Sequence, residues 1–183
     1  MAKEGVRDYA AVKRKAAERL ALAETKHLPS NEEIEHELRR YLALFQPQQL
    51  STRLSLLRSV ALEAMRFLQA FEPRLVGALL TGAVTEGTAV ELHLSADMPE
   101  AVGLWLTEQE IPFEQSEKRL RFGGERHETL PTYRFNADDV TVELCVFNRR
   151  SVRETPLSPV DGKPMKRANL REVETLVTLT SGA

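Results

Sequence analysis

Cysteine is almost absent from this sequence, and its single cysteine, Cys145, excludes a disulfide within the chain. A reducing compartment is the simplest interpretation of that composition. Long apolar runs are absent as well, because no stretch approaches the roughly 20 residues that a transmembrane helix needs. The charged N-terminus lacks the apolar core of a signal peptide. We therefore expect a cytoplasmic protein without a membrane partner.

The sequence also lacks an excess of either charge, since 25 basic and 27 acidic residues give a net charge of −2. Nothing global attracts nucleic acid or an anionic membrane, so a binding patch has to be local. Glycine-rich phosphate loops, dinucleotide fingerprints, Cys-x-x-Cys and Gly-x-Ser-x-Gly motifs are all missing. What is present is a chain of 183 residues, 42% hydrophobic and 28% charged, which suffices for one domain with a helical extension.

The first third of the chain has the apolar spacing of helices. An apolar stripe recurs at helical intervals over residues 9–23. A second helix is expected from Ser30, because Glu33 three residues later completes a capping box, and Pro47 closes it. A third is expected over about 50–70. We therefore predict a helical region over residues 1–70.

The middle of the chain alternates short strands with a helix. An apolar run at 75–80 and an alternating segment at 90–94 indicate two strands. Asp97 begins a capping pattern for a helix that ends near Ile111 and Pro112. Further strands are expected at 119–122, 132–136 and 140–147. This order predicts an α+β fold, with a short mixed sheet covered by helices over residues 71–150.

Polar side chains fall in phase on two of these strands. Alternation places Glu91 and His93 on one face of the segment at 90–94, and Glu143 lies within 140–147. A small-residue turn precedes them, at Thr81, Gly82 and Ala83. This layout resembles the nucleotidyltransferase superfamily of polymerase-β type, over roughly residues 75–147.

The resemblance implies a site for metal-dependent nucleotidyl transfer. In that family a small-residue turn follows the first strand, an Asp-x-Asp pair lies on the second, and a third carboxylate comes from a neighbouring strand. By this resemblance residues 81–83 correspond to the ligand-binding turn. Glu91 and His93 stand for the Asp pair, and Glu143 for the third carboxylate. These three residues are therefore the candidate catalytic residues and metal ligands.

The sequence departs from the family pattern at each of these positions. Glu91 is one methylene longer than Asp, and Ala83 lacks the serine hydroxyl of the family's turn. His93 offers an imidazole, which suits zinc, copper or iron better than the oxygen-seeking Mg²⁺. We therefore expect a degenerate family member, without transfer activity and without a cofactor. A divalent metal ion bound by Glu91, His93 and Glu143 is the alternative.

A plain β-hairpin is an equal alternative for the central stretch. Residues 75–80 and 88–94 would then pair across the turn at 85–87. In that arrangement Glu91 and His93 would be polar residues on an open face, with ion pairs to Arg134 or Arg121.

The last part of the chain, residues 151–183, begins with a proline-rich basic segment. The prolines favour an extended path held against the body, and Asn169 with Glu172 forms a capping box for a final helix packed on the core. Basic side chains nearby would bind a phosphate or an acidic group, with a solvated loop as the alternative. The candidate ligand-binding cations are Arg134, Lys163, Lys166 and Arg167.

Three functions are consistent with these patterns. The first is a non-catalytic, nucleotidyltransferase-like protein that binds a nucleotide or other anionic small molecule, or else a protein partner or a second copy of itself. The second is an active nucleotidyltransferase with a variant metal site. The third is a helical protein-interaction module whose sheet serves as scaffold; an apolar helix face left exposed would favour it.

Overall fold

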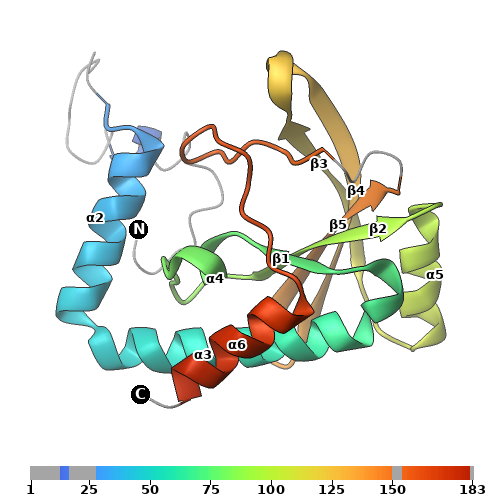
Figure 1. Ribbon diagram of the computed structural model, residues 1–183, viewed down its shortest axis with the longest axis horizontal. Helices are drawn as coiled ribbons and strands as arrows, with labels where there is room; N and C mark the ends of the chain where they lie inside the picture. Colours follow the sequence, from blue (N-terminus) through green and yellow to red (C-terminus); the bar gives the residue numbers. More distant parts are fainter. Residues whose placement is uncertain (1–12, 17–27, 150–153, 182–183) are drawn as a thin grey trace.

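The computed structural model describes residues 13–16, 28–149 and 154–181 (Figure 1). Residues 13–16 are helical, and the rest of the helix predicted over 9–23 lies outside the described residues. Within the described residues no helix is both long and apolar enough to cross a membrane. The elements in chain order are α2 (Asn31–Phe45), α3 (Pro47–Phe67), η1 (Gln69–Phe71), β1 (Arg74–Val76), α4 (Ala78–Thr81), β2 (Val90–Ala96), α5 (Glu100–Glu108), β3 (Glu114–Arg121), η2 (Gly123–Glu125), β4 (His127–Ala137), β5 (Val140–Asn148) and α6 (Leu170–Ser181).

The fold is α+β with a mixed sheet covered by helices, as predicted, and the sheet has five strands. The strand order is β1-β2-β5-β4-β3. β2 and β5 run parallel, and every other neighbouring pair is antiparallel. The parallel register places Glu91 beside Glu143 and His93 beside Cys145. The two strands that carry the candidate residues are therefore direct neighbours.

Local capping explains where the helices begin. At α2 the Ser30 hydroxyl accepts from the Glu33 N–H at 3.1 Å, and the Glu33 carboxylate accepts from the Ser30 N–H at 2.7 Å. Pro47 ends α2 and forms the first turn of α3, which therefore starts slightly earlier than predicted. Asn169 and Glu172 form the matching pair of bonds at α6. The prediction of an Asp97 cap was wrong, because α5 begins at Glu100 and has no side-chain capping bond.

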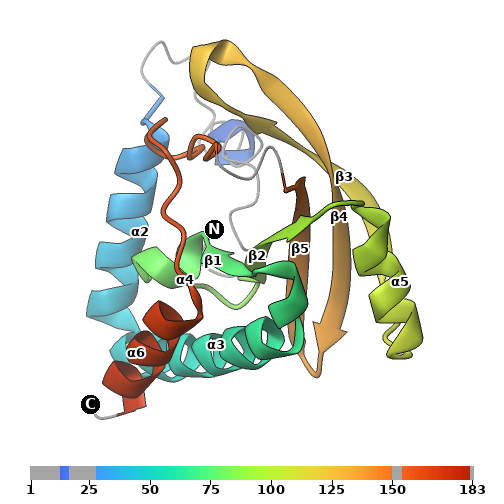
Figure 2. The same ribbon diagram turned by 45° about the vertical axis from the view of Figure 1, so that its right-hand side comes forward.

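One face of the sheet holds the main core. The side chains of Leu92 on β2 and Leu144 on β5 are fully buried against Leu57 and Met65 of α3. α5 and α6 belong to the same core, and α6 enters it through Val173. Figure 2 shows α3 and α6 side by side along this part of the molecule. Even positions of β2 and β5 therefore point into the core, and odd positions point to the other face.

The other face is covered in part by a smaller apolar cluster and by the C-terminal segment. The cluster consists of Phe122, Leu130, Cys145 and Phe147. Residues 154–168 cross this side without forming a strand. Leu157 donates its N–H to the Arg121 carbonyl at 2.7 Å, and an isolated bridge pairs Ala168 with Leu75. This covered zone encloses part of the face that we expected to be open.

Candidate functional site

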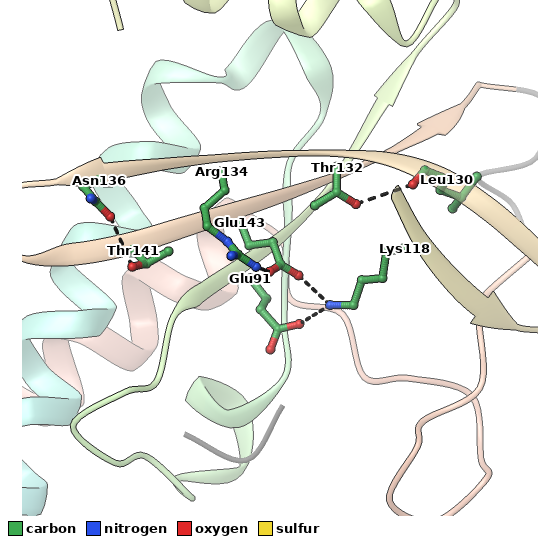
Figure 3. Close-up of polar contacts among 8 residues, drawn as sticks. All are labelled: Glu91, Lys118, Leu130, Thr132, Arg134, Asn136, Thr141 and Glu143. Atoms are coloured by element: carbon green, nitrogen blue, oxygen red, sulfur yellow. Dashed lines mark hydrogen bonds and ion pairs between the residues drawn. The ribbon is translucent and has the colours of Figure 1, made fainter. Parts of the chain in front are cut away.

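Glu91 and Glu143 form a cluster of four charged side chains with Lys118 and Arg134 (Figure 3). The Lys118 Nζ lies 3.0 Å from a Glu91 carboxylate oxygen and 2.6 Å from a Glu143 oxygen. The second Glu143 oxygen accepts from Arg134 Nη2 at 2.8 Å. We call Glu91 and Glu143 the acidic pair and the four residues together the charge cluster. The Lys118 ammonium bridges the acidic pair.

Lys118 comes from β3, which is separated from β2 by two other strands. β4 pairs with β5 only from Thr132 onward, although it pairs with β3 from His127. Pro131 lies where the pairing with β5 stops, and proline has no amide hydrogen to continue a ladder. Beyond that point the β3–β4 hairpin is free of β5, and the Lys118 side chain points back toward the acidic pair (Figure 3).

The cluster balances its own charge. Burial alone would lower the pKa of Lys118, but the carboxylates of Glu91 and Glu143 outweigh it and raise that pKa above its ordinary value. Burial would likewise raise the pKa of Glu143, but Lys118 and Arg134 hold it below its ordinary value. Lys118 and Glu143 therefore hold each other in their charged forms, and in the cluster two cationic side chains face two carboxylates.

His93 lies on the same face as the acidic pair but does not join it. Only 4% of the residue is exposed, and its ring lies 4.7 Å from the ring of Phe147. Burial, with the nearby charges of Arg167 and Lys118, lowers the pKa of its imidazole to about 3. The described residues contain no group of three or more His, Cys, Asp or Glu that could hold a metal ion. The predicted metal set of Glu91, His93 and Glu143 is thus corrected: His93 packs in the apolar cluster, and Lys118 lies between the carboxylates.

The turn assigned to Thr81, Gly82 and Ala83 also has to be corrected. These residues end α4: the Gly82 N–H is bonded to the Ala78 carbonyl at 2.8 Å, and the Thr81 hydroxyl donates to the same carbonyl at 3.3 Å. The end of a helix presents carbonyls, not the amides that hold an anion. The run at 75–80 is a strand only to Val76, so the predicted strand over the whole run is not present. β1 and β2 do pair antiparallel, but α4 lies between them, so they do not form a plain hairpin.

The chain turns from strand to helix at Gly77. Its φ of +78° lies in the region that favours glycine, and a Cβ there would lie 3.0 Å from Glu91 Oε1. Gly77 is therefore the small residue at the turn beside Glu91. It lies four residues before the start of the turn that the sequence pattern predicted at 81–83.

We expect Gly77→Ala to lower the free energy of unfolding by about 1–3 kcal/mol, because it combines backbone strain with contact against Glu91. Gly82→Ala is the matched control, since Gly82 has a φ of +80° but nothing within 4 Å of an added Cβ. Urea unfolding should show the larger loss at Gly77. Equal losses would mean that the Glu91 carboxylate simply moves aside.

The predicted ligand-binding cations lie in two places. Arg134 belongs to the charge cluster. Arg167 is half-buried, with its guanidinium 5.1 Å from the centroid of the Phe147 ring and a bond to the Glu154 carbonyl at 3.2 Å. Lys163 and Lys166 are exposed on the C-terminal segment. Arg134 and Arg167 are thus engaged with the protein itself.

Comparisons with known proteins add little to this geometry. No family model matches the chain, and neither does any curated protein. Among solved structures, the chain is similar to a chain from a "structure of GLD-2/RNP-8 complex", with 20% sequence identity and a TM-score of 0.35. The match covers 80% of this chain and 53% of the other, so this chain spans about half the length of its neighbour.

Proposed function

We propose that this chain is a nucleotidyltransferase-like binding domain that does not carry out metal-dependent nucleotidyl transfer. The observation that carries the proposal is the Lys118 ammonium between Glu91 and Glu143, at 3.0 and 2.6 Å. Two neighbouring carboxylates are the oxygen ligands that Mg²⁺ prefers, and transfer depends on such ions to neutralise phosphate charge. Here a side chain of the protein supplies the positive charge instead.

The same geometry argues for a protein partner over an anionic ligand. Lys118 and Arg134 are already neutralised by the acidic pair, so the cluster offers no free positive charge to a phosphate. By contrast, α2 exposes large apolar side chains: 47% of Tyr41, 65% of Leu44 and 69% of Phe45. An exposed apolar helix face is typical of an interaction surface.

The test is transfer of label from nucleoside triphosphates in the presence of Mg²⁺, Mn²⁺ or Zn²⁺. We expect no transfer by the wild-type protein, and no rise in its melting temperature with these ions, because a ligand that does not bind cannot stabilise the native state. In Lys118→Met the acidic pair loses its internal cation, so a rise with Mn²⁺ is expected in that variant alone.

Label transfer by the wild-type protein that disappears in both Glu91→Ala and Glu143→Ala would overturn the proposal in favour of an active transferase. Requiring the loss in both variants guards against misfolding of either one. A melting temperature that rises with metal in the wild-type protein as much as in Lys118→Met would show that the ammonium does not block the acidic pair.

A further inference from the structure

The C-terminal segment, residues 154–168, leads to α6 (Figure 1) and is attached to the sheet at a few points. Leu157 donates its N–H to a carbonyl at the end of β3, and Ala168 and Leu75 exchange two backbone hydrogen bonds of 2.9 Å. Within the segment only Pro156 and Ala168 are buried. Segments with few buried contacts open at a lower free energy than the core of the same protein. This segment can therefore open while the main core stays folded.

His93 has a buried ring nitrogen that makes no hydrogen bond. Only 4% of the residue is exposed, and Nδ1 has no hydrogen-bond partner within the described part of the chain. The imidazole lies 4.7 Å from the Phe147 ring, and the Arg167 guanidinium lies 5.1 Å from the centroid of the same ring. Phe147 thus joins a titratable group on β2 to a cation on the C-terminal segment. A buried charge without a hydrogen-bonding partner is costly, so the closed arrangement favours the neutral imidazole.

Charged and titratable groups surround His93 on the strands and on the C-terminal segment. They are Glu91 on β2, Arg74 on β1, Glu143 and Cys145 on β5, Arg134 on β4, Lys118 on β3 and Arg167 on the segment. Burial, followed by the charges of Arg167 and Lys118, lowers the pKa of the His93 imidazole to about 3, and Glu143 opposes this shift. Burial also raises the pKa of the Cys145 thiol to about 12, so the neighbouring thiol stays neutral. A proton on His93 would therefore be repelled by Arg167.

From these contacts we infer that the C-terminal segment is an acid-released latch, in which protonation of His93 detaches the segment at Arg167 and Ala168. The contacts that carry this inference are the Phe147 ring shared by His93 and Arg167, the unpartnered Nδ1 and the sparse attachment of the segment. This conformational change is independent of the binding role proposed above. It would hold equally in a protein that binds no partner.

The direction of the pH dependence follows from the two states of His93. In the open state the imidazole regains a pKa near its ordinary value of 6.5, whereas in the closed state its pKa is about 3. The closed state is therefore fully favoured above the ordinary value and loses stability as pH falls toward the closed-state pKa. From about pH 7.5 to about pH 5 the equilibrium constant for opening should rise about 30-fold. Glu143, whose pKa is below its ordinary value of 4.5, titrates below this window.

Hydrogen exchange of the full chain at the two ends of this pH window tests the latch. Protection is the intrinsic exchange rate of an amide divided by its measured rate at the same pH, which removes the slowing of the exchange chemistry in acid. Protection of the Ala168 N–H, which is bonded to the Leu75 carbonyl, should fall about 30-fold in the wild-type protein. At both pH values it should be lower than the protection of amides within α3, because the segment opens without the main core.

Two variants remove the titrating group without adding a charge. In His93→Leu and in His93→Gln the protection of Ala168 should change by less than about threefold over the same pH window. Using both replacements keeps the test decisive if one of them does not fold, which circular dichroism verifies. His36→Gln is the matched control, because His36 is exposed on α2. It should keep the fall of the wild-type protein.

Three results would overturn the latch. Ala168 protection that stays constant from about pH 7.5 to about pH 5 in the wild-type protein would show that acid does not release the segment. A wild-type fall that persists in the folded His93 variants would assign the acid sensitivity to another group. Equal protection of Ala168 and of the α3 amides would mean that the segment opens only when the whole protein unfolds.

Discussion

Glu143→Gln should lower the free energy of unfolding by about 3 kcal/mol, the largest loss we expect from a polar substitution in this protein. The Glu143 side chain is only 11% exposed and accepts from both Lys118 and Arg134. Glutamine keeps the shape but removes the charge, so Arg134 loses its carboxylate partner and Lys118 keeps only Glu91. This loss of stability is at the lower end of the range for breaking a buried ion pair, because the side chains of Lys118 and Arg134 are partly exposed.

The control for this substitution is Glu91→Gln. The Glu91 side chain is 35% exposed, and among the described residues its ion pair is with Lys118, which would still be paired with Glu143. Glu91→Gln should lower the free energy of unfolding by about 1 kcal/mol or less, as for the loss of a surface ion pair. Urea unfolding at neutral pH measures both variants. The claim that Glu143 stabilises the fold more than Glu91 would be refuted if Glu143→Gln were as stable as the wild-type protein. It would also be refuted if Glu143→Gln lost no more stability than Glu91→Gln.

The effect of Glu143→Gln should also depend on pH in a definite direction. The pKa of Glu143 is lower in the folded protein than its ordinary value of 4.5, so folding favours the charged form. The stabilisation is therefore complete above that ordinary value and is lost as pH falls through the lower, folded-state pKa. The stability difference between wild-type protein and Glu143→Gln should be constant near neutrality and shrink in acid. A difference that grew in acid would contradict this assignment.

Phe147→Ala should cost about 3–5 kcal/mol, the range for truncating a fully buried aromatic side chain. Phe147 is 0% exposed, and its ring contacts the imidazole of His93 and the guanidinium of Arg167. Leu104→Ala, on the exposed surface of α5, should change stability by no more than about 0.5 kcal/mol. Thermal or urea unfolding compares the two.

Phe147→Ala has a second expected consequence, because Arg167 belongs to the C-terminal segment. Loss of the ring should loosen that segment, so amides that bond across it should exchange faster with deuterium. The Leu157 N–H, bonded to Arg121, and the Ala168 N–H, bonded to Leu75, report on its two ends. Unchanged protection at both amides would mean that the segment is held without Phe147.

Local signals predicted much of this fold. The capping boxes at Ser30 and Asn169 and the proline at 47 located helix ends, because each depends on residues a few positions apart. Alternation gave the correct phase of β2 and β5, whose buried faces are strongly apolar. It could not give the full length of β3, since that edge strand is mostly exposed and its polar sequence carries no alternating apolar signal.

Only part of the site could be predicted from the sequence, because some of its contacts join residues on strands that are not neighbours in the sheet. Glu91 and Glu143 have a strand phase that the sequence shows. Lys118 could not be found, because its contact with Glu91 spans two intervening strands and depends on where β4 leaves β5. The hairpin alternative placed His93 on an open face, but its ring packs against Phe147, and Arg167 of the C-terminal segment lies over that same Phe147 ring. Gly77 was hidden inside an apolar run that looked like a continuous strand.

The Lys118 ammonium is a counter-ion that is covalently part of the chain. A dissolved ion occupies a site according to its concentration, whereas a tethered group keeps a fixed effective concentration beside its partners. Dialysis and chelators such as EDTA cannot remove it, and a change in the metal content of the surroundings does not alter its occupancy. The acidic pair is therefore occupied by a cation as soon as the chain folds, in any medium that leaves the lysine protonated.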